Sequence, residues 1–394
     1  MTKKQRLIAL AIVAVIHIAA FAPTIGSASS ILDRGFWPQS ERILDGQLPY
    51  REVNFEYPPL ALPLVIAPAL VSDGPGGYEY AFETQMLLVD LALLALLALA
   101  VPGSTRRVVE ALGVYTVGLI AVSGVVLWDS TIESGPLALA RFDLVPAGLI
   151  LAALLAREAK RSALWGALLG AATAVKAFPA VLAPSMLRGE KAPLRALAAA
   201  AIPLLVAAAI VIVWGDEFGS AISYHSNRDL QIETLGATPL LVAHQLFGAG
   251  AQVTTGAGAF NLSASGAGAA RTISIALTIG LVLFLIYECW VRRTPALIEA
   301  TAVLAVIIVF APVLSPQFLL WVLPISAVAY GAGRENAALL ACFVLTELLL
   351  HNYIGVETLD SGFVWSVAAR NAALLVYLAL VVIPIFKPGR TLKT

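Results

Sequence analysis

The chain has 394 residues, of which 59% are hydrophobic and 13% are charged, and its mean hydropathy is +0.87. Soluble proteins carry roughly 25% charged residues, so this composition excludes a soluble fold of this size, and it also excludes a disordered chain. The net charge is zero, which gives no indication of a nucleic-acid partner. Each membrane crossing takes about 20 apolar residues, so the length predicts an all-α polytopic membrane protein with about 10–12 transmembrane helices.

The first predicted element is a membrane span over residues 7–25. Lys3, Lys4 and Arg6 precede this apolar run, and basic residues favour the cytoplasmic side of a span. The small residues at 26–30 also fit the exit of a signal peptide, but the apolar run is long for one and many spans follow. We therefore expect an uncleaved first span with a cytoplasmic N-terminus, in a multi-pass protein of the plasma membrane.

Further apolar segments follow in chain order, and all are predicted to be helices because an open strand would leave its backbone unpaired in lipid. They lie at about 60–72, 80–101, 108–128, 142–156, 163–186, 196–214, 237–249, 272–291, 297–313, 318–331, 336–350 and 364–386. Basic clusters mark the cytoplasmic loops and leave four polar stretches on the outer side, namely 26–59, 129–141, 215–236 and 351–363.

We expect one integral membrane domain over residues 1–394, without a soluble domain or an internal repeat. Within it, 26–59 forms a long first extracytoplasmic loop, and 215–236 forms a second outer loop near the site. Residues 38–45 are predicted to form a short helix that ends at Gly46. The stretch 249–270 is rich in Gly, Ala, Ser and Thr, and we expect a flexible outer loop there.

Two apolar segments do not fit simple crossings. Residues 60–72 are too short for a comfortable span, and residues 163–186 lie between two basic loops, so they should enter the membrane and return. Lys176 and Pro179 lie in the middle of the second segment. Non-helical backbone at membrane depth is tolerated only inside protein or beside a watery cavity. Both segments are therefore predicted to be half-length helices near a site.

Polar residues in such a chain are expensive and usually functional. Besides the two outer loops, they include Arg141, Asp143, Lys176 and Gln317. A carboxylate near cations at a lipid interface suits group transfer from a lipid phosphate, because the carboxylate takes a proton from an acceptor hydroxyl and the cations stabilise the departing phosphate. Such a leaving group requires no metal, and we expect neither a metal nor another cofactor.

Alternatives stay open at this level. The same residues could serve a secondary transporter or lipid flippase, although transporters tend to bury charges at the midplane and to show inverted repeats. A non-catalytic membrane scaffold is a further possibility. Asp90 lies within an apolar run and is expected to pair with a polar group of a neighbouring helix. The two cysteines also lie in apolar runs and are expected to be core residues.

Five segments, in order, carry a resemblance to a known family. They are Asp33 with Gly46-Gln-Leu-Pro-Tyr-Arg-Glu-Val-Asn-Phe-Glu-Tyr-Pro-Pro-Leu60, Arg141-Phe-Asp143-Leu-Val-Pro, Ala174-Val-Lys176-Ala-Phe-Pro179, His225-Ser-Asn-Arg228-Asp-Leu-Gln231-Ile-Glu233, and Ser315-Pro-Gln317-Phe-Leu-Leu-Trp321. Together they cover about residues 7–330 and resemble glycosyltransferase family 87. These are membrane enzymes of the GT-C type, related to the polyprenyl-phosphate-mannose-dependent mannosyltransferases of actinobacteria.

The resemblance implies an inverting transfer of a sugar, mannose or arabinofuranose, from a polyprenyl-phosphate donor to a glycolipid or glycan acceptor on the outer face of the cell envelope. By position in the first outer loop, it assigns the catalytic base to Asp33. Donor phosphate would be held by Lys176, Arg228 and Arg141. The further site candidates are Glu56, Tyr57, His225, Glu233, Asp143 and Gln317.

Each assignment has a structural alternative. Asp33 could cap the helix that follows it or pair with Arg34. Lys176 could extend its ammonium group to the membrane interface. Arg141 and Asp143 could form an ion pair with each other or between helices.

Overall fold

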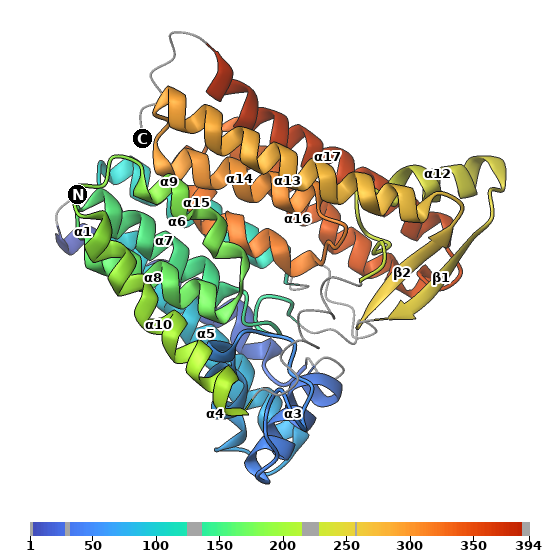
Figure 1. The fold of residues 1–394 in the computed structure, drawn as a ribbon, viewed down its shortest axis with the longest axis horizontal. Helices are drawn as coiled ribbons and strands as arrows, with labels where there is room; N and C mark the ends of the chain where they lie inside the picture. Colours follow the sequence, from blue (N-terminus) through green and yellow to red (C-terminus); the bar gives the residue numbers. More distant parts are fainter. Residues whose placement is uncertain (1–2, 28–31, 124–135, 215–227, 257, 388–394) are drawn as a thin grey trace. The chain divides into compact units, whose positions relative to one another are not determined.

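The computed structural model describes residues 3–27, 32–123, 136–214, 228–256 and 258–387 (Figure 1), and for Asp33 and Arg34 it describes the backbone alone. The chain forms two compact units, residues 1–226 and 227–394. Among the described residues, six helices are long and apolar enough to cross a membrane, and five apolar helices are shorter. The protein is thus a helical multi-pass membrane protein, as its composition predicted.

In the first unit, three long helices pack together. They are α1 (Lys3–Phe21), extended by η1 (Ala22–Thr24), α5 (Pro75–Ala100) and α6 (Thr105–Ala121). Asp90 in α5 is fully buried, and its carboxylate binds His17 Nδ1 at 2.6 Å and accepts a hydrogen bond from the Tyr115 hydroxyl at 2.7 Å. His17 Nε2 lies 2.9 Å from the Thr116 hydroxyl. The predicted pairing of Asp90 with neighbouring helices is therefore confirmed.

The first loop has short helices at its beginning and end. They are η2 (Leu32–Phe36), α3 (Trp37–Leu44), η3 (Pro59–Ala61) and α4 (Leu62–Ala69). The predicted helix over 38–45 is confirmed as α3, and Gly46 follows it with φ +92°, a conformation that favours glycine. The segment 60–72 is half-length, as expected, because α4 ends at Ala69.

The remaining helices of the first unit are α7 (Leu144–Glu158), α8 (Ser162–Val175), η4 (Phe178–Leu182), α9 (Ala183–Leu187) and α10 (Pro193–Trp214). The predicted break in 163–186 is confirmed, because Lys176 ends α8 in an extended conformation, with φ −148° and ψ 133°. Gly166 and Gly170 let α8 approach the backbone of α10 closely, since a Cβ at Gly166 would lie 2.0 Å from the carbonyl oxygen of Ala196.

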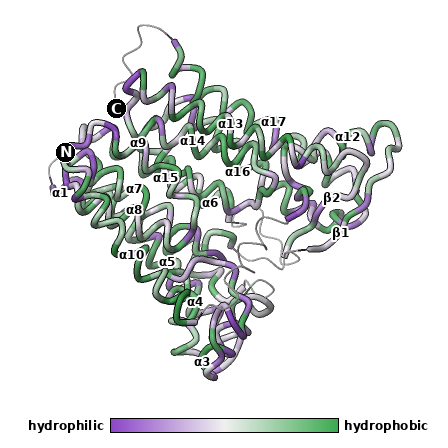
Figure 2. Tube along the Cα trace, viewed as in Figure 1, coloured by the Kyte–Doolittle hydropathy of each residue, from purple (hydrophilic) through white to green (hydrophobic). Residues whose placement is uncertain are grey.

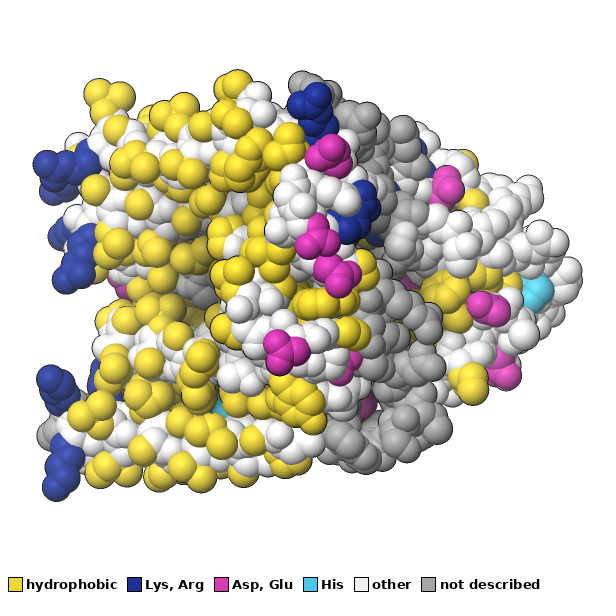
Figure 3. Space-filling model, turned by 90° about the horizontal axis from the view of Figure 1, so that it is seen from below, with side chains coloured by type: hydrophobic (Ala, Val, Ile, Leu, Met, Phe, Trp, Pro, Cys, Tyr) yellow, Lys and Arg dark blue, Asp and Glu magenta, His cyan; other side chains and the backbone are white. Residues whose placement is uncertain are grey.

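Basic side chains fix one end of the first unit. Arg6 donates hydrogen bonds to the carbonyl oxygens of Ala98, Val101 and Gly103, so the start of α1 lies beside the α5–α6 turn. Arg157 likewise donates to carbonyl oxygens in and just after α9. Figure 3 shows one face on which Lys and Arg side chains gather at one end of the hydrophobic side chains, while Asp and Glu side chains, with some Lys and Arg side chains among them, lie toward the other. This is the pattern expected of membrane spans with basic cytoplasmic loops.

The second unit is built around two buried helices, α14 (Ala296–Phe310) and α15 (Leu319–Tyr330). The other elements are α12 (Thr238–Phe247), β1 (Ala251–Gly256), β2 (Ala259–Ala264), α13 (Ala267–Arg292), η5 (Pro316–Phe318), α16 (Arg334–His351), η6 (Asn352–Gly355) and α17 (Ser361–Phe386). Of the most apolar 18-residue stretch of α13, only 17% is buried inside the protein. Most of the surface of this helix is therefore left for lipid. The helices are mostly hydrophobic in both units (Figure 2).

The expectation of a flexible loop at 249–270 is wrong. β1 and β2 form an antiparallel hairpin, paired from Ala251 with Ala264 to Gly256 with Ala259. Leu262 is buried in a small apolar core with residues of α12, α16 and α17, and Val253 and Phe260 pack against it. The alternation of apolar residues along the two strands drives this packing, but small residues make that alternation weak in the sequence.

Candidate functional site

In the first unit, a buried ion pair forms where three segments of the chain meet. The Lys176 ammonium lies 2.5 Å from the Asp143 carboxylate, and the two side chains are 14% and 3% exposed. Asp143 immediately precedes α7, but its side chain makes no capping bond to that helix. Its carboxylate pairs instead with Lys176, which stands at the break after α8.

Aromatic rings surround this ion pair. The Lys176 ammonium lies 5.7 Å from the ring centre of Tyr57 and 5.3 Å from that of Phe142, and these two rings meet edge to face at 4.8 Å. The Tyr50 hydroxyl donates a hydrogen bond to the carbonyl oxygen of Tyr57 at 2.6 Å. The end of the first loop is thereby fixed against α7 and α8, and the ring faces stabilise the cation.

Two further charged residues, Glu56 and Arg141, act on the same cluster. Both interact electrostatically with Lys176 and Tyr57. Arg141 is half-buried, and its Nε is buried without a hydrogen-bond partner among the described residues. Burial raises the pKa of Tyr57 well above its ordinary value, and the charge of Glu56 raises it further, so the phenol stays protonated. An unused guanidinium donor beside a lysine is suited to an anionic ligand.

This cluster lies near one end of the helices. α8 begins at Ser162, just after the basic turn, and ends after 14 residues at Val175. At a rise of 1.5 Å per residue, Lys176 is about 21 Å along the helix from that turn. Since the hydrocarbon core is about 30 Å thick, the cluster lies well toward the side opposite the basic residues.

The segment that carries Asp33 reaches the same region. η2 packs through Phe36, whose ring lies 6.0 Å from that of Tyr57, 5.8 Å from that of Phe142 and 5.5 Å from that of Phe82 in α5. The Asp33 side chain lies outside the described part of the structure, so its assigned role stays a prediction. The backbone nonetheless places its helix against two of the aromatic residues that enclose Lys176.

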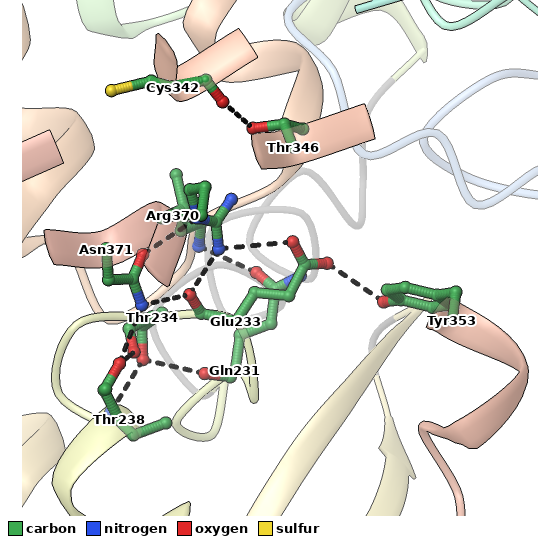
Figure 4. A network of polar contacts seen from close by, with 11 residues as sticks. Gln231, Glu233, Thr234, Thr238, Cys342, Thr346, Tyr353, Arg370 and Asn371 are labelled. Carbon is green, nitrogen blue, oxygen red and sulfur yellow. Dashed lines mark hydrogen bonds and ion pairs between the residues drawn. The ribbon is translucent and has the colours of Figure 1, made fainter. Parts of the chain in front are cut away.

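In the second unit, a polar network joins a turn to a membrane helix (Figure 4). Arg370 in α17 is fully buried; its Nη2 donates to the Glu233 carbonyl oxygen at 2.7 Å and lies 3.5 Å from the Glu233 carboxylate. Asn371 also donates to the Glu233 carbonyl oxygen, at 3.0 Å, and the Tyr353 hydroxyl donates to the carboxylate at 3.0 Å. Gln231 accepts a hydrogen bond from the backbone N–H of Leu314. These bonds fix the turn that follows residue 228.

Burial is the main influence on the pKa of the Glu233 carboxyl group. It raises the pKa of Glu233, while the positive charge of Arg370 and the hydrogen bond from Tyr353 act in the opposite direction. Nη1 of Arg370 and one oxygen of Glu233 are buried without a hydrogen-bond partner among the described residues. Glu233 thus anchors the turn to α17 and η6 through its hydrogen bonds, and it is also a site candidate.

The predicted site residues thus fall into groups. Lys176, Asp143, Arg141, Glu56 and Tyr57 lie together in the first unit. In the second unit, Glu233 belongs to the network with Arg370, the half-buried Gln317 lies in η5, and the Arg228 carbonyl oxygen accepts a hydrogen bond from Arg271. His225 lies outside the described residues.

Sequence reasoning missed Arg370 and its partners Asn371 and Tyr353. The signal was present, because an arginine within the apolar run 364–386 is costly unless it is paired inside the protein. No group of three or more His, Cys, Asp or Glu side chains with metal-binding geometry occurs in the part of the chain that the structure describes. Both cysteines are buried core residues, as predicted.

Comparison with known proteins gives the family. The model of glycosyltransferase family 87 matches residues 55–316, about two thirds of the chain, and the chain belongs to this family. It is accordingly a membrane-embedded glycosyltransferase. The matched range contains the Lys176 cluster and the Glu233 turn, whereas Asp33 and Arg370 lie outside it.

No curated protein matches the chain significantly. Among solved structures, a crystal structure of ArnT from Cupriavidus metallidurans bound to undecaprenyl phosphate is similar, with 15% sequence identity and a TM-score of 0.44. The likeness covers 97% of this chain and 77% of that one.

Proposed function

We propose that this protein is an inverting glycosyltransferase that moves a sugar from a polyprenyl-phosphate donor to a glycolipid or glycan acceptor. Membership of glycosyltransferase family 87 supports the reaction class. The observation that carries the donor assignment is the presence of two cations, Lys176 and Arg141, in one cluster, together with the buried Nε of Arg141, which has no hydrogen-bond partner among the described residues. Two cations in a partly buried site suit a lipid phosphate at the edge of the hydrocarbon core.

In this proposal the cations work on the leaving group. As the bond between the sugar and the phosphate breaks, negative charge grows on the phosphate oxygens. Fixed cations in a site with little water stabilise that charge more in the transition state than in the ground state. Lys176 and Arg141 would supply these cations, and Arg228 would add a third. Asp143 would keep Lys176 charged and in place before the donor arrives.

Asp33 would act as the general base. It would accept the proton of the acceptor hydroxyl as the oxygen attacks the sugar carbon opposite the phosphate, which inverts that carbon. The position of η2 against Tyr57 and Phe142 supports this assignment. Glu56, Tyr57, His225, Glu233 and Gln317 would line or hold the acceptor side of the site.

The proposal extends to the transferred sugar and to the orientation of the protein in the membrane. The sugar would be mannose or arabinofuranose, as in mannosyltransferases of actinobacteria. The N-terminus would be cytoplasmic and the site would open to the extracytoplasmic face of the plasma membrane. The gathering of basic side chains at the end opposite the Lys176 cluster supports this orientation.

The test is a transfer assay on membranes or purified protein with radiolabelled polyprenyl-phosphate sugars and extracted glycolipid. Asp33→Asn should abolish product formation while the protein still elutes as a folded species in detergent. Asp45→Asn is the matched control, because Asp45 is an exposed acid of the same loop, and its activity should equal that of the wild type. Turnover by Asp33→Asn at the wild-type rate would refute the base assignment. A labelled sugar that crosses vesicles without forming a covalent product would favour the transporter alternative.

A further inference from the structure

The first outer loop is tied to α5 just before the segment that carries Asp33. Glu83 in α5 is fully buried, and its carboxylate accepts a hydrogen bond from the backbone N–H of Gly26. The turn itself is closed by the hydroxyls of Thr24 and Ser27, which donate to the carbonyl oxygens of Phe21 and Thr24 at 2.8 and 2.6 Å. The chain therefore leaves α1 along a path that a buried carboxylate fixes.

Gly26 is adapted to this contact. Its φ is +89°, which side chains other than glycine rarely adopt. A Cβ at this position would lie 2.4 Å from the ring of Tyr80, the residue beside Glu79 in α5. The positive φ favours glycine here, and a side chain at this position would also require the exposed Tyr80 ring to move.

The neighbouring side of α5 holds the other end of the segment. The Phe36 ring packs on Phe82 at 5.5 Å, and the Trp37 ring packs on Tyr78 at 5.6 Å. Tyr78 and Phe82 are four residues apart in α5 and share one side of it, while Glu79 and Glu83 share the adjacent side. The chain from Gly26 to Trp37 is thus held at both ends by neighbouring turns of one helix.

A carboxylate is an expensive choice for this tie. A buried ionised group costs several kcal/mol unless hydrogen bonds compensate it, and Glu79, one turn earlier in α5, is also buried. The hydrogen bond from the Gly26 N–H compensates part of this cost and fixes the loop backbone at that point.

We infer that Glu83 is a positioning residue that fixes the entry of the first outer loop, so that η2 presents Asp33 to the acceptor. The inference rests on the proposed function of Asp33. Glu83 itself touches the Gly26 backbone rather than the reacting atoms. Because a misplacement of about 1 Å can cost roughly 100-fold in rate, loss of this tie should lower kcat and leave donor binding nearly unchanged.

The test compares two substitutions of Glu83. Glu83→Leu removes the acceptor for the Gly26 N–H, and kcat should fall about 10- to 100-fold with the donor KM within about twofold. Glu83→Gln keeps a carbonyl oxygen in the same place, and kcat should stay within about threefold of the wild type. The matched control is Glu110→Gln, a partly exposed acid of α6 that pairs with Arg106 at the basic end, and its kinetics should not change.

A second approach acts from the loop side, in case Glu83→Leu does not fold. Gly26→Ala should lower kcat in the same way, because alanine is strained at φ +89° and the Gly26 backbone must shift. Hydrogen exchange in the peptide 22–37 should accelerate in this variant, while exchange within α5 should not change.

Three results would overturn the inference: wild-type kcat in both Glu83→Leu and Gly26→Ala, a loss in Glu83→Gln as large as in Glu83→Leu, or unchanged exchange in 22–37. The third readout does not depend on catalysis. Asp33→Asn, measured in parallel, reports on the proposed base separately, so failure of the base assignment and failure of the tether give different results.

Discussion

The ion pair of Lys176 and Asp143 has two roles that mutation can separate. Replacing Lys176 by Met takes the ammonium group away from the Asp143 carboxylate, which is only 3% exposed. Breaking a buried pair from one side costs about 3–5 kcal/mol. Because Lys176 is itself 14% exposed, we expect the lower end of that range, about 3 kcal/mol. Replacing both residues, as Lys176→Met with Asp143→Leu, removes both charges and should restore stability.

The double variant should regain stability but should not regain catalytic activity. If Lys176 contacts donor phosphate, the double variant lacks one charged hydrogen bond, worth about 1.5–3 kcal/mol. Its kcat/KM should therefore be roughly 10- to 100-fold below that of the wild type. Thermal unfolding in detergent gives the stabilities, and the radiolabelled transfer assay gives the rates. A double variant with both wild-type stability and wild-type turnover would show that the pair is purely structural.

Three further predictions concern stability. His17→Ala and Asp90→Ala should each lower the melting temperature in detergent, and the double-mutant cycle should give a coupling of about 1 kcal/mol, as for other hydrogen bonds between membrane helices; additive effects would contradict the contact. Glu190 lies outside the spans and accepts hydrogen bonds from the Ala192 N–H and neighbouring side chains, which lower its pKa. Its contribution to stability is therefore present above the ordinary pKa of a glutamate and disappears as pH falls through the lowered value. Glu190→Gln should flatten the acid side of the profile of stability against pH. Tyr353→Phe removes one hydrogen bond to buried Glu233 and should cost about 1–3 kcal/mol in thermal unfolding.

Local signals in the sequence were sufficient to predict where apolar helices break or stop short. A basic residue and a proline in the middle of 163–186 predicted the break after Val175, and the length of 60–72 predicted a half-length helix. In both cases the physical constraint acts within about a dozen residues. Lipid allows irregular backbone only where protein covers it, so such a break is visible without knowledge of the neighbours.

The sequence did not predict in the same way which side chain Asp143 pairs with. The sequence left open whether Asp143 pairs with its neighbour Arg141 or across helices, and the structure shows a pair across helices, with Lys176, which is 33 residues away. The two segments meet because α7 and α8 pack together, with Asp143 at the start of α7 and Lys176 at the end of α8. Pairing of this kind is set by helix packing, which pattern and spacing do not reveal. For Arg370 the cost of an arginine in an apolar run was visible in the sequence, but its partners Glu233 and Asn371 were not.

The charge balance of the Lys176 cluster links its structure to the proposed reaction. Lys176 and Arg141 carry two positive charges, and Asp143 and Glu56 carry two negative ones, so the cluster is close to neutral before a donor binds. Neutrality lowers the cost of placing these groups beside hydrocarbon. A phosphate that enters adds negative charge and competes with Asp143 for Lys176. A further cation would strengthen donor binding, and Arg228 is the residue we propose for that role. On this argument Arg228→Gln should raise the donor KM more than Asp143→Asn does, because the second change removes a competitor of the phosphate; the reverse order would mean that Asp143 does not compete.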